Sequence, residues 1–226
     1  MKKVTLAFLR HAKVPSHKGD MPLTADSGAD IQAAIPKLRA MIGQGDDVLF
    51  LATRTQRSQQ TAVALRDAIA PEAPEILPAW GLRNPDLYLA GSRVEMGSTP
   101  EFLASQCEHL SLPRDAAAEH PFFGAFLTAP DRIEYWLNHE TPPGENAAAV
   151  AKRVLQFAES FLDMPSHNDL VVACVTHSPV MRAILTKGLN LSDPGEPGWV
   201  EAIVIEVTRG GMTFRFRDHF GAVQHA

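Results

Sequence analysis

The sequence predicts an α/β fold, a three-layer sandwich in which helices cover both faces of a mostly parallel central sheet. Two apolar runs, Val4 to Leu9 and Leu170 to Val175, indicate buried strands because they are continuous and too short for helices. Residues 47–52 form another run of the same kind, and this is the second predicted strand in chain order. Each run is followed along the chain by a segment with helical character. Strands that alternate with helices in this way build a parallel sheet that is covered on both faces.

The helices are expected where apolar residues recur every three or four positions. Residues 27–42 place Ile31, Ala34, Ile35, Leu38 and Met41 on one face, as a helix packed against a sheet requires. The helix after the strand at 47–52 carries Ala62, Leu65 and Ile69 in the same manner. Two more helices are expected over about 145–162 and 179–189, and a short third strand near 75–77.

The rest of the chain departs from this alternation in two places. Two final strands, about 200–207 and 212–217, are joined at residues 209–211 by a plausible hairpin turn and add an antiparallel edge. The stretch at about 81–143 is rich in loops and has short helical patches at 101–110 and 121–127. We expect residues 1–226 to form a single domain, with the stretch at 81–143 inserted as a mainly helical cap over the crevice of the sheet.

The composition is that of an ordinary globular protein of one domain. The chain has 226 residues, of which 45% are hydrophobic and 21% charged. Its net charge of −5 argues against a general binder of nucleic acid or of membrane surfaces. The first apolar run is too short for a signal peptide, and none approaches the ~18 residues of a membrane helix. We therefore expect a cytoplasmic protein, and the oligomeric state leaves no signature in the sequence.

The cysteines give no sign of a metal site. Only Cys107 and Cys174 occur, and their spacing matches neither a C-x-x-C motif nor a zinc site. Cys174 lies inside an apolar run, which is typical of a buried, unreactive thiol. No other set of residues has the spacing of metal ligands, so we expect neither a metal nor a cofactor.

Polar side chains follow three of the predicted strands. Arg10 and His11 come directly after the first strand, and His177 ends the strand at 170–176. Arg57 lies near the start of the helix after the second strand, where backbone amides and the helix dipole favour an anion. Residues at the carboxyl ends of strands line the ligand crevice of open α/β sheets. A lone histidine after a strand is usually just a polar residue, but this convergence predicts a pocket that attacks and holds a phosphoryl group.

Five short motifs accompany these residues in a fixed order along the chain. The first is Leu9 to Ala12, and the second is Pro22 to Thr24 with Gly28 and Gln32 following. The third is the segment Thr53 to Ala62, which contains Arg54 and Arg57. The fourth is Pro143 to Asn146 with Arg153 further on, and the fifth is Val175 to Ser178.

Together these motifs resemble those of the histidine phosphatases, the superfamily that includes the cofactor-dependent phosphoglycerate mutases. Leu9 to Ala12 is similar to the arginine-histidine-glycine signature, with Ala12 where glycine is usual. The third motif maps the phosphate-binding arginine of the family onto Arg57 rather than Arg54. The fifth resembles the signature of the second histidine. Each motif is weak alone, but five in the right order are a specific signal, and they span most of the chain outside the cap.

The resemblance implies a covalent mechanism in two steps. His11 attacks phosphorus through a neutral ring nitrogen to form a phosphohistidine, which water then hydrolyses. The other ring nitrogen is held by a hydrogen bond. Arg10, Arg57 and His177 contact the non-bridging oxygens of the phosphoryl group, where negative charge must be neutralised. No metal takes part.

The general acid departs from the family pattern. Many members have a glutamate in the loop after the third strand that protonates the leaving oxygen, and the matching position here is Asn84, which cannot act as an acid. We expect Asp86, two residues on, to replace it, although a solvated loop aspartate is an equally common role for such a residue. Glu95 and Glu145 are outside alternatives, and Glu145 is better placed to stabilise the first turn of its helix.

Four further residues are expected to bind substrate. His17 stands where the family often has an asparagine that touches phosphate, so it could donate a hydrogen bond, or it could be a surface histidine. Thr24 and Ser178 belong to the second and fifth motifs. Arg83 could bind a carboxylate or a second phosphate at the mouth of the pocket, as could Arg93, Lys13 and Lys18, although solvated charge is the default for all four.

The expected function is a phosphatase that hydrolyses a phosphomonoester of a small molecule. A phosphohistidine phosphatase acting on a protein is the first alternative, because those family members lack the usual glutamate and residues 86–90 are similar to a stretch in some of them. A mutase-type phosphotransferase is less favoured, because it must protect the phosphoenzyme from water and the matching glutamate is absent. The last alternative is a phospholigand-binding domain without activity, although binding alone does not need a nucleophile.

Overall fold

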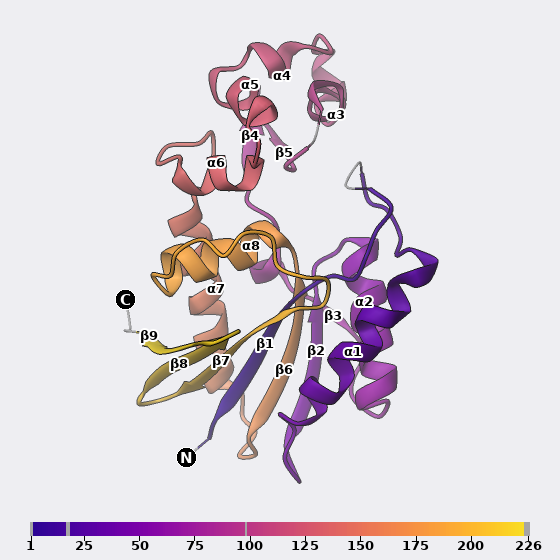
Figure 1. Cartoon of the computed structure of the whole chain (residues 1–226), viewed down its shortest axis with the longest axis vertical. Helices are drawn as coiled ribbons and strands as arrows, with labels where there is room; N and C mark the ends of the chain where they lie inside the picture. The colour runs from indigo at the N-terminus through magenta and orange to yellow at the C-terminus, as the bar shows by residue number, and fades with distance from the viewer. Residues whose placement is uncertain (1, 17–18, 98, 224–226) are drawn as a thin grey trace.

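The computed structural model describes residues 2–16, 19–97 and 99–223 (Figure 1). Within these residues a seven-stranded sheet has the strand order β3-β2-β6-β1-β7-β8-β9, and β4 and β5 pair separately. The strands of the large sheet are β1 (Val4–Arg10), β2 (Asp47–Ala52), β3 (Leu77–Pro78), β6 (Leu170–Thr176), β7 (Ala202–Thr208), β8 (Gly211–Phe216) and β9 (His219–Val223).

The centre of the sheet is parallel and one edge is antiparallel, as the sequence predicts. β2 pairs in parallel with β3 and β6, and β6 pairs in parallel with β1. β7 runs antiparallel to β1, and β8 and β9 continue the antiparallel edge. β9 was not expected from the sequence, because its residues include two aromatic and two small side chains without a clear alternation.

Helices cover both faces of the sheet, which confirms the predicted fold class (Figure 1). The helices α1 (Gly28–Arg39) and α2 (Gln56–Ile69) lie on one face, and α7 (Ala147–Glu159) and α8 (Ser178–Ala183) lie on the other. β1 is buried along its whole length, and its side chains alternate between two cores. Leu6 and Phe8 belong to the core under α7 and α8, whereas Ala7 and Leu9 belong to the core under α1 and α2.

Some boundaries differ from the predicted ones. α1 ends at Arg39, three residues before the predicted end. α8 ends at Ala183 and continues as a π-helical turn over Ile184–Gly188, so the predicted helix at 179–189 changes its hydrogen-bonding pattern midway. Short 3-10 turns lie at Ala25–Ser27, Trp80–Leu82, Glu108–Leu110 and Ser160–Asp163.

Among its described residues, the segment between β3 and α7 contains a hairpin and four short α-helices. The hairpin consists of β4 (Leu87–Leu89) and β5 (Ser92–Val94), and the helices are α3 (Pro100–Ser105), α4 (Ala116–Glu119), α5 (Pro121–Thr128) and α6 (Arg132–Asn138). Figure 1 shows these elements beyond the end of the sheet at which β1 and β6 finish. Four aromatic side chains of this segment are buried in the same core as those of α7 and α8: Phe122, Phe123, Phe126 and Trp136. We interpret this segment as the cap.

No helix in the described ranges is both long enough and apolar enough to cross a lipid bilayer.

Candidate active site

Two histidines stand side by side at the carboxyl ends of paired strands. Arg10 of β1 is the register partner of Thr176 of β6, so His11 and His177 leave the sheet at the same level. The backbone N–H of His11 donates to the carbonyl of Thr176 at 3.0 Å. The two rings have centroids 5.4 Å apart and an interplanar angle of 65°. Each histidine is 3% exposed, so both rings are held by packing.

The ring of His11 is oriented by the backbone. Its Nδ1 lies 2.8 Å from the carbonyl oxygen of Ala12. Because a carbonyl only accepts, Nδ1 carries the proton, and the lone pair of the neutral ring is then on Nε2. The N–H of Ala12 donates to Thr61 Oγ1 at 3.0 Å, which fixes that carbonyl in turn. Ala12 stands where glycine is usual in the family. Its side chain is fully buried, so the fold accommodates the extra methyl group.

Three of the described residues contact the guanidinium of Arg10. Its Nη2 lies 2.6 Å from Glu196 Oε1, and its Nη1 donates to the carbonyl of Pro197 at 2.6 Å. The guanidinium lies over the ring of Trp199, 3.6 Å from the centroid. Burial lowers the pKa of Arg10, and the charge of Glu196 opposes this shift. Nε of Arg10 is buried and has no hydrogen-bond partner among the described residues, so this N–H can donate to a bound ligand.

Arg57 comes from the first turn of α2 and is 8% exposed. Its Nη1 lies 3.6 Å from Asp20 Oδ1 and 3.4 Å from the carbonyl of Gly19. Burial lowers the pKa of Arg57, and the charges of Glu95 and Asp20 oppose this. Asp20 also accepts a hydrogen bond from the N–H of Gln56 at 2.8 Å, so a carboxylate already occupies the helix N-terminus that the sequence offers to an anion. Like Arg10, Arg57 has a buried Nε without a partner among the described residues.

His177 is the N-cap residue of α8 and is held by β2. Its Nε2 lies 3.0 Å from the hydroxyl of Thr53, which directly follows that strand. The neighbouring Ser178 is buried, and its hydroxyl donates to Glu196 Oε2 at 2.6 Å. Glu196 thus links Ser178 to Arg10.

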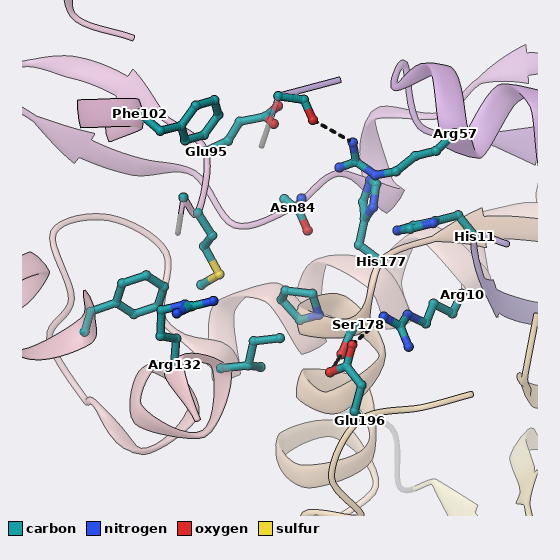
Figure 2. Close-up of a pocket in the computed structure, with 16 residues that line it drawn as sticks. Arg10, His11, Arg57, Asn84, Glu95, Phe102, Arg132, His177, Ser178 and Glu196 are labelled. Atoms are coloured by element: carbon teal, nitrogen blue, oxygen red, sulfur yellow. Dashed lines mark hydrogen bonds and ion pairs between the residues drawn. The ribbon is translucent and has the colours of Figure 1, made fainter. Parts of the chain in front are cut away.

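These residues line one cavity of about 130 Å³. Arg10, His11, Arg57 and His177 form the side at the sheet, as the sequence predicts, and Ser178 lies beside them (Figure 2). Residues of the cap form the opposite side: Met96, Gly97, Phe102, Phe126, Arg132 and Ile133. A second cavity of about 270 Å³ shares Asn84, Glu95 and His177 with the first and extends past Arg54 and Trp80.

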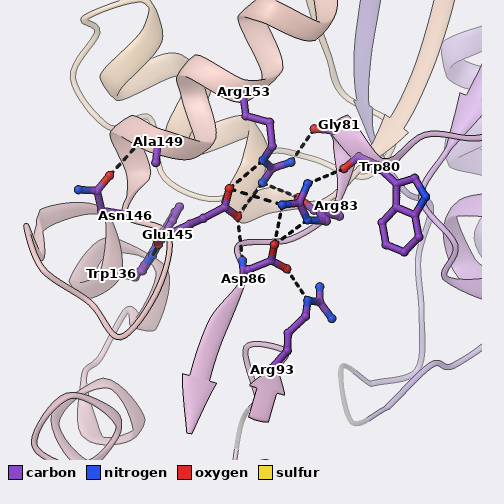
Figure 3. Close-up of polar contacts among 10 residues, drawn as sticks. All are labelled: Trp80, Gly81, Arg83, Asp86, Arg93, Trp136, Glu145, Asn146, Ala149 and Arg153. Atoms are coloured by element: carbon purple, nitrogen blue, oxygen red, sulfur yellow. Dashed lines mark hydrogen bonds and ion pairs between the residues drawn. The ribbon is translucent and has the colours of Figure 1, made fainter. Parts of the chain in front are cut away.

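The structure does not bring Asp86 to this site. Among the described residues, it is absent from the walls of both cavities. Its carboxylate accepts hydrogen bonds from Arg83 at 2.9 and 2.5 Å and from Nε of Arg93 (Figure 3). Burial alone would raise the pKa of Asp86, but the hydrogen bonds and charges of the two arginines outweigh it and leave the pKa below its ordinary value. An ionised carboxylate held away from the cavity is poorly suited to be the acid.

Asp86 belongs to a network that joins the loop after β3 to α7. Its N–H donates to Glu145 Oε2 at 2.9 Å, and Glu145 is bound by Arg153 at 3.0 and 3.1 Å. Arg153 also donates to the carbonyl of Gly81 at 2.6 Å (Figure 3). The fourth sequence motif, which contains Glu145 and Arg153, therefore supports the loop that carries Asn84.

The other expected substrate-binding residues lie in different places. Arg83 lines the second cavity, but its guanidinium is bound to Asp86. Thr24 lies outside both cavities, and its hydroxyl donates to the carbonyl of Lys13 at 3.3 Å, so it orders the loop after His11. His17 falls outside the residues that the structure describes.

The sequence does not assign Glu196 and Arg132 to this site, and it offers Glu95 only as an outside alternative for the acid. Glu196 lies in the loop before β7, and Arg132 begins α6. Glu95 follows β5 and lines both cavities. The helix start at Arg132 has a detectable signal, because Asp131 is a favoured N-cap residue and accepts from the N–H groups of Ile133 and Glu134. Nothing in the sequence indicates that these loops return to the end of the sheet.

No group of three or more histidine, cysteine, aspartate or glutamate side chains could hold a metal within the described ranges. Both cysteines are buried and free, and burial raises the pKa of the Cys174 thiol.

Comparison with known proteins agrees with the motifs. The model of the histidine phosphatase superfamily (branch 1) matches residues 120–217, and no curated protein matches the sequence. Among solved structures, a mycobacterial glucosyl-3-phosphoglycerate phosphatase is similar at 19% identity and a TM-score of 0.57, over 92% of each chain. YhfR from Bacillus stearothermophilus is similar at 19% identity and a TM-score of 0.56, over 95% of each chain. A phosphoserine phosphatase from Entamoeba histolytica shares 11% identity over 96% of each chain, with a TM-score of 0.53. The family match and the shared fold confirm what the motifs predict: this chain is similar to the histidine phosphatase superfamily (branch 1).

Proposed function

We propose that this chain hydrolyses a phosphomonoester of a small molecule through a covalent phosphohistidine on His11. The observation that carries the proposal is the convergence of Arg10, His11, Arg57 and His177 on one cavity, with the His11 ring held at Nδ1. The family match supports a phosphatase or phosphotransferase-type activity. Two proteins with the same fold are named as phosphatases of glucosyl-3-phosphoglycerate and phosphoserine, which supports a small substrate.

In the first step, the lone pair on Nε2 of His11 forms a bond to phosphorus while the bond from phosphorus to the ester oxygen breaks. Arg10, Arg57 and His177 bind the non-bridging oxygens and neutralise the charge that they carry in the transition state. The buried Nε donors of Arg10 and Arg57 have no acceptor among the described residues, and a phosphoryl oxygen would supply one.

The leaving alkoxide needs a proton, and we propose Glu95 as its source. Glu95 lines both cavities, and within the described residues its carboxylate forms one ion pair, with Arg93 at 3.9 Å, while its charge also acts on Arg57. Glu196 also lines the cavity, but its two oxygens are bound by Arg10 and Ser178. Asn84 occupies the cavity wall at the position of the family's glutamate, and its Oδ1 can only accept.

In the second step, water attacks the phosphohistidine and the phosphorus–nitrogen bond breaks, which returns the lone pair to Nε2. The Glu95 carboxylate, deprotonated in the first step, takes a proton from this water. Inorganic phosphate then leaves, and Glu95 and His11 are restored.

The size of the cavity favours a small substrate over a phosphorylated protein. At about 130 Å³, with Phe102 and Phe126 of the cap on its wall, it accepts a compact leaving group.

Hydrolysis of 4-nitrophenyl phosphate in the presence of EDTA tests this proposal, because an aryl leaving group departs without help from an acid. We expect activity in the wild type, and activity at background in His11→Ala. The matched control is His219→Ala, which removes an exposed imidazole on β9 and should retain wild-type activity. Activity that survives in His11→Ala would contradict the proposal. Binding of phosphate by a wild type that never turns over would favour the non-catalytic phospholigand-binding domain.

A further inference from the structure

Arg132 differs from the other arginines of the cavity in having no anionic partner. Arg10 is paired with Glu196 and Arg57 with Asp20. No carboxylate in the described ranges lies within ion-pair distance of Arg132. Figure 2 shows its side chain reaching into the cavity from the cap, on the side opposite Arg10 and His11. The cavity therefore has a cationic group at each end.

The start of α6 is fixed to the part of the fold that carries the histidines. Asp131, the N-cap residue of α6, forms an ion pair with Arg182 of α8 at 2.8 Å. Arg182 is 1% exposed and is bound from its other side by Asp193, at 3.0 Å to Nε. α8 begins directly after His177. The backbone at Arg132 is therefore fixed relative to the end of the cavity that contains His11 and His177.

The cap side of the wall is largely apolar. Met96, Phe102, Phe126 and Ile133 line it, and Glu95 is its acidic residue. The side chain of Arg132 is exposed to solvent in the free protein, so a substrate that fills the cavity covers part of its guanidinium and brings an anionic group to that charge beside apolar side chains. An apolar group in the same place would cover part of the guanidinium without supplying a partner for its charge.

We propose that the leaving group of the substrate carries a second anionic group, a carboxylate or a phosphate, that is bound by Arg132. This rests on the proposed function only in placing the first phosphoryl group at His11. The sequence suggests Arg83 and Arg93 for such a role, but both form ion pairs with Asp86. Arg132 is thus a specificity-determining residue on the cap, and the substrate is a small phosphate ester with charged groups at both ends.

Binding of phosphonates tests this independently of turnover, because the phosphorus–carbon bond is not hydrolysed. The probes are propylphosphonate, 3-phosphonopropanoate, in which a carboxylate replaces the methyl group, and ethylene-1,2-diphosphonate. We expect the wild type to bind at least one of the two doubly charged probes at least about 10-fold more tightly than propylphosphonate, as a hydrogen-bonded ion pair allows. Which of the two binds more tightly distinguishes a carboxylate from a phosphate.

Arg132→Gln should remove this preference, and Arg132→Lys should retain part of it. The matched control is Arg114→Gln, which removes an equal charge from an exposed position of the cap outside the cavity. Inorganic phosphate should bind Arg132→Gln as tightly as wild type, which shows that the variant is folded and that the phosphoryl end is intact.

Two results test the inference: whether the wild type prefers a doubly charged phosphonate, and whether this preference depends on Arg132. It is overturned if the wild type binds all three probes equally, or if Arg132→Gln keeps the preference. A preference that depends on Arg132, in a protein that hydrolyses no phosphate ester, would refute the proposed function and leave this inference standing. Turnover of propyl phosphate without any preference among the probes would refute this inference alone.

Discussion

Thr53 and His177 are hydrogen-bonded to each other across the ends of two neighbouring parallel strands. The hydroxyl of Thr53, which follows β2, lies 3.0 Å from Nε2 of His177, which follows β6. Both residues are 3% exposed. The hydroxyl of Thr55 lies 3.1 Å from that of Thr53 and extends the chain of contacts. Because the rings of His177 and His11 are neighbours, we infer that Thr53 is a positioning residue, which sets the angle at which His177 would meet a phosphoryl group at His11.

The variant Thr53→Val removes this hydroxyl and keeps the shape of the side chain. We expect kcat/KM for 4-nitrophenyl phosphate to fall about 10-fold, which is the effect of losing one hydrogen bond at a buried group. Thr53→Ser restores the hydroxyl and should restore most of the activity. Thr208→Val, on the distant strand β7, serves as the control. A Thr53→Val enzyme with unchanged kcat/KM would show that this contact does not position His177.

The identity of the general acid is tested by the leaving group. We expect Glu95→Gln to slow formation of the phosphoenzyme about 100-fold with an alkyl phosphate and much less with 4-nitrophenyl phosphate, because only the alkoxide needs a proton. Hydrolysis of the phosphoenzyme, in which Glu95 takes a proton from water, should slow equally for both substrates. Asp86→Asn should affect both substrates to the same degree, since Asp86 lies outside the cavity. The opposite pattern, a selective loss of alkyl phosphate hydrolysis in Asp86→Asn, would restore Asp86 as the acid.

The ion pairs of Asp86 make stability depend on pH. The two arginines hold its pKa in the folded protein below the ordinary value of 3.8, so the unfolded chain takes up this proton at a higher pH than the folded protein does. The stabilisation is therefore complete above about pH 4 and is lost as the pH falls through the lower folded-state pKa. We expect Asp86→Asn to be less stable than wild type to urea at about pH 6. The difference should shrink at about pH 3, and a constant difference would contradict the assignment.

Gly144 sits at a close approach between the fourth motif and the loop that carries Asp86. Its φ is +140°, and a Cβ there would lie 2.1 Å from the carbonyl oxygen of Asp86 and 2.9 Å from Cα of Leu87. Because backbone atoms cannot yield easily, we expect Gly144→Ala to lower the free energy of unfolding by about 3 kcal/mol. Gly45→Ala is the control, since Gly45 also has a positive φ of +87° but open space around it. It should lose only about 1 kcal/mol, and equal losses in the two variants would show that the close approach does not matter.

The positions of the two histidines could be predicted because they depend only on where buried strands end. Val4 to Leu9 and Leu170 to Val175 are continuous apolar runs, and parallel strands finish at one edge of the sheet whatever else the chain does. Arg57 was found for a similar reason, because it follows β2 within one helical turn.

The contacts of Asp86 could not be predicted in full, because Arg93, one of the two arginines that bind it, comes from a hairpin that the sequence does not indicate. β4 and β5 pair Tyr88 with Arg93, which brings Arg93 back to Asp86. The turn of this hairpin has two residues, Ala90 and Gly91, and both have positive φ angles, 48° and 78°. Glycine is usual in such a turn. Alanine is unusual in such a turn, so the pattern resembles an ordinary loop.

Arg132 and Glu196 could not have been found by spacing or periodicity. Arg132 reaches the cavity because Arg182 ties Asp131 to α8, a contact between residues 51 positions apart. Glu196 reaches Arg10 across 186 positions of the chain, in a loop rich in proline and glycine. Contacts of this kind arise from the packing of the whole cap and sheet, and a local pattern carries no information about them.

Trapping of the phosphoenzyme tests the central claim most directly. The wild type is mixed with 4-nitrophenyl phosphate, quenched with alkali during turnover, and digested for mass spectrometry, because a phosphohistidine survives alkali. We predict a phosphoryl group on His11 that forms and decays at rates compatible with turnover. A phosphoryl group on another residue, or turnover without any phosphoenzyme on His11, would contradict the account.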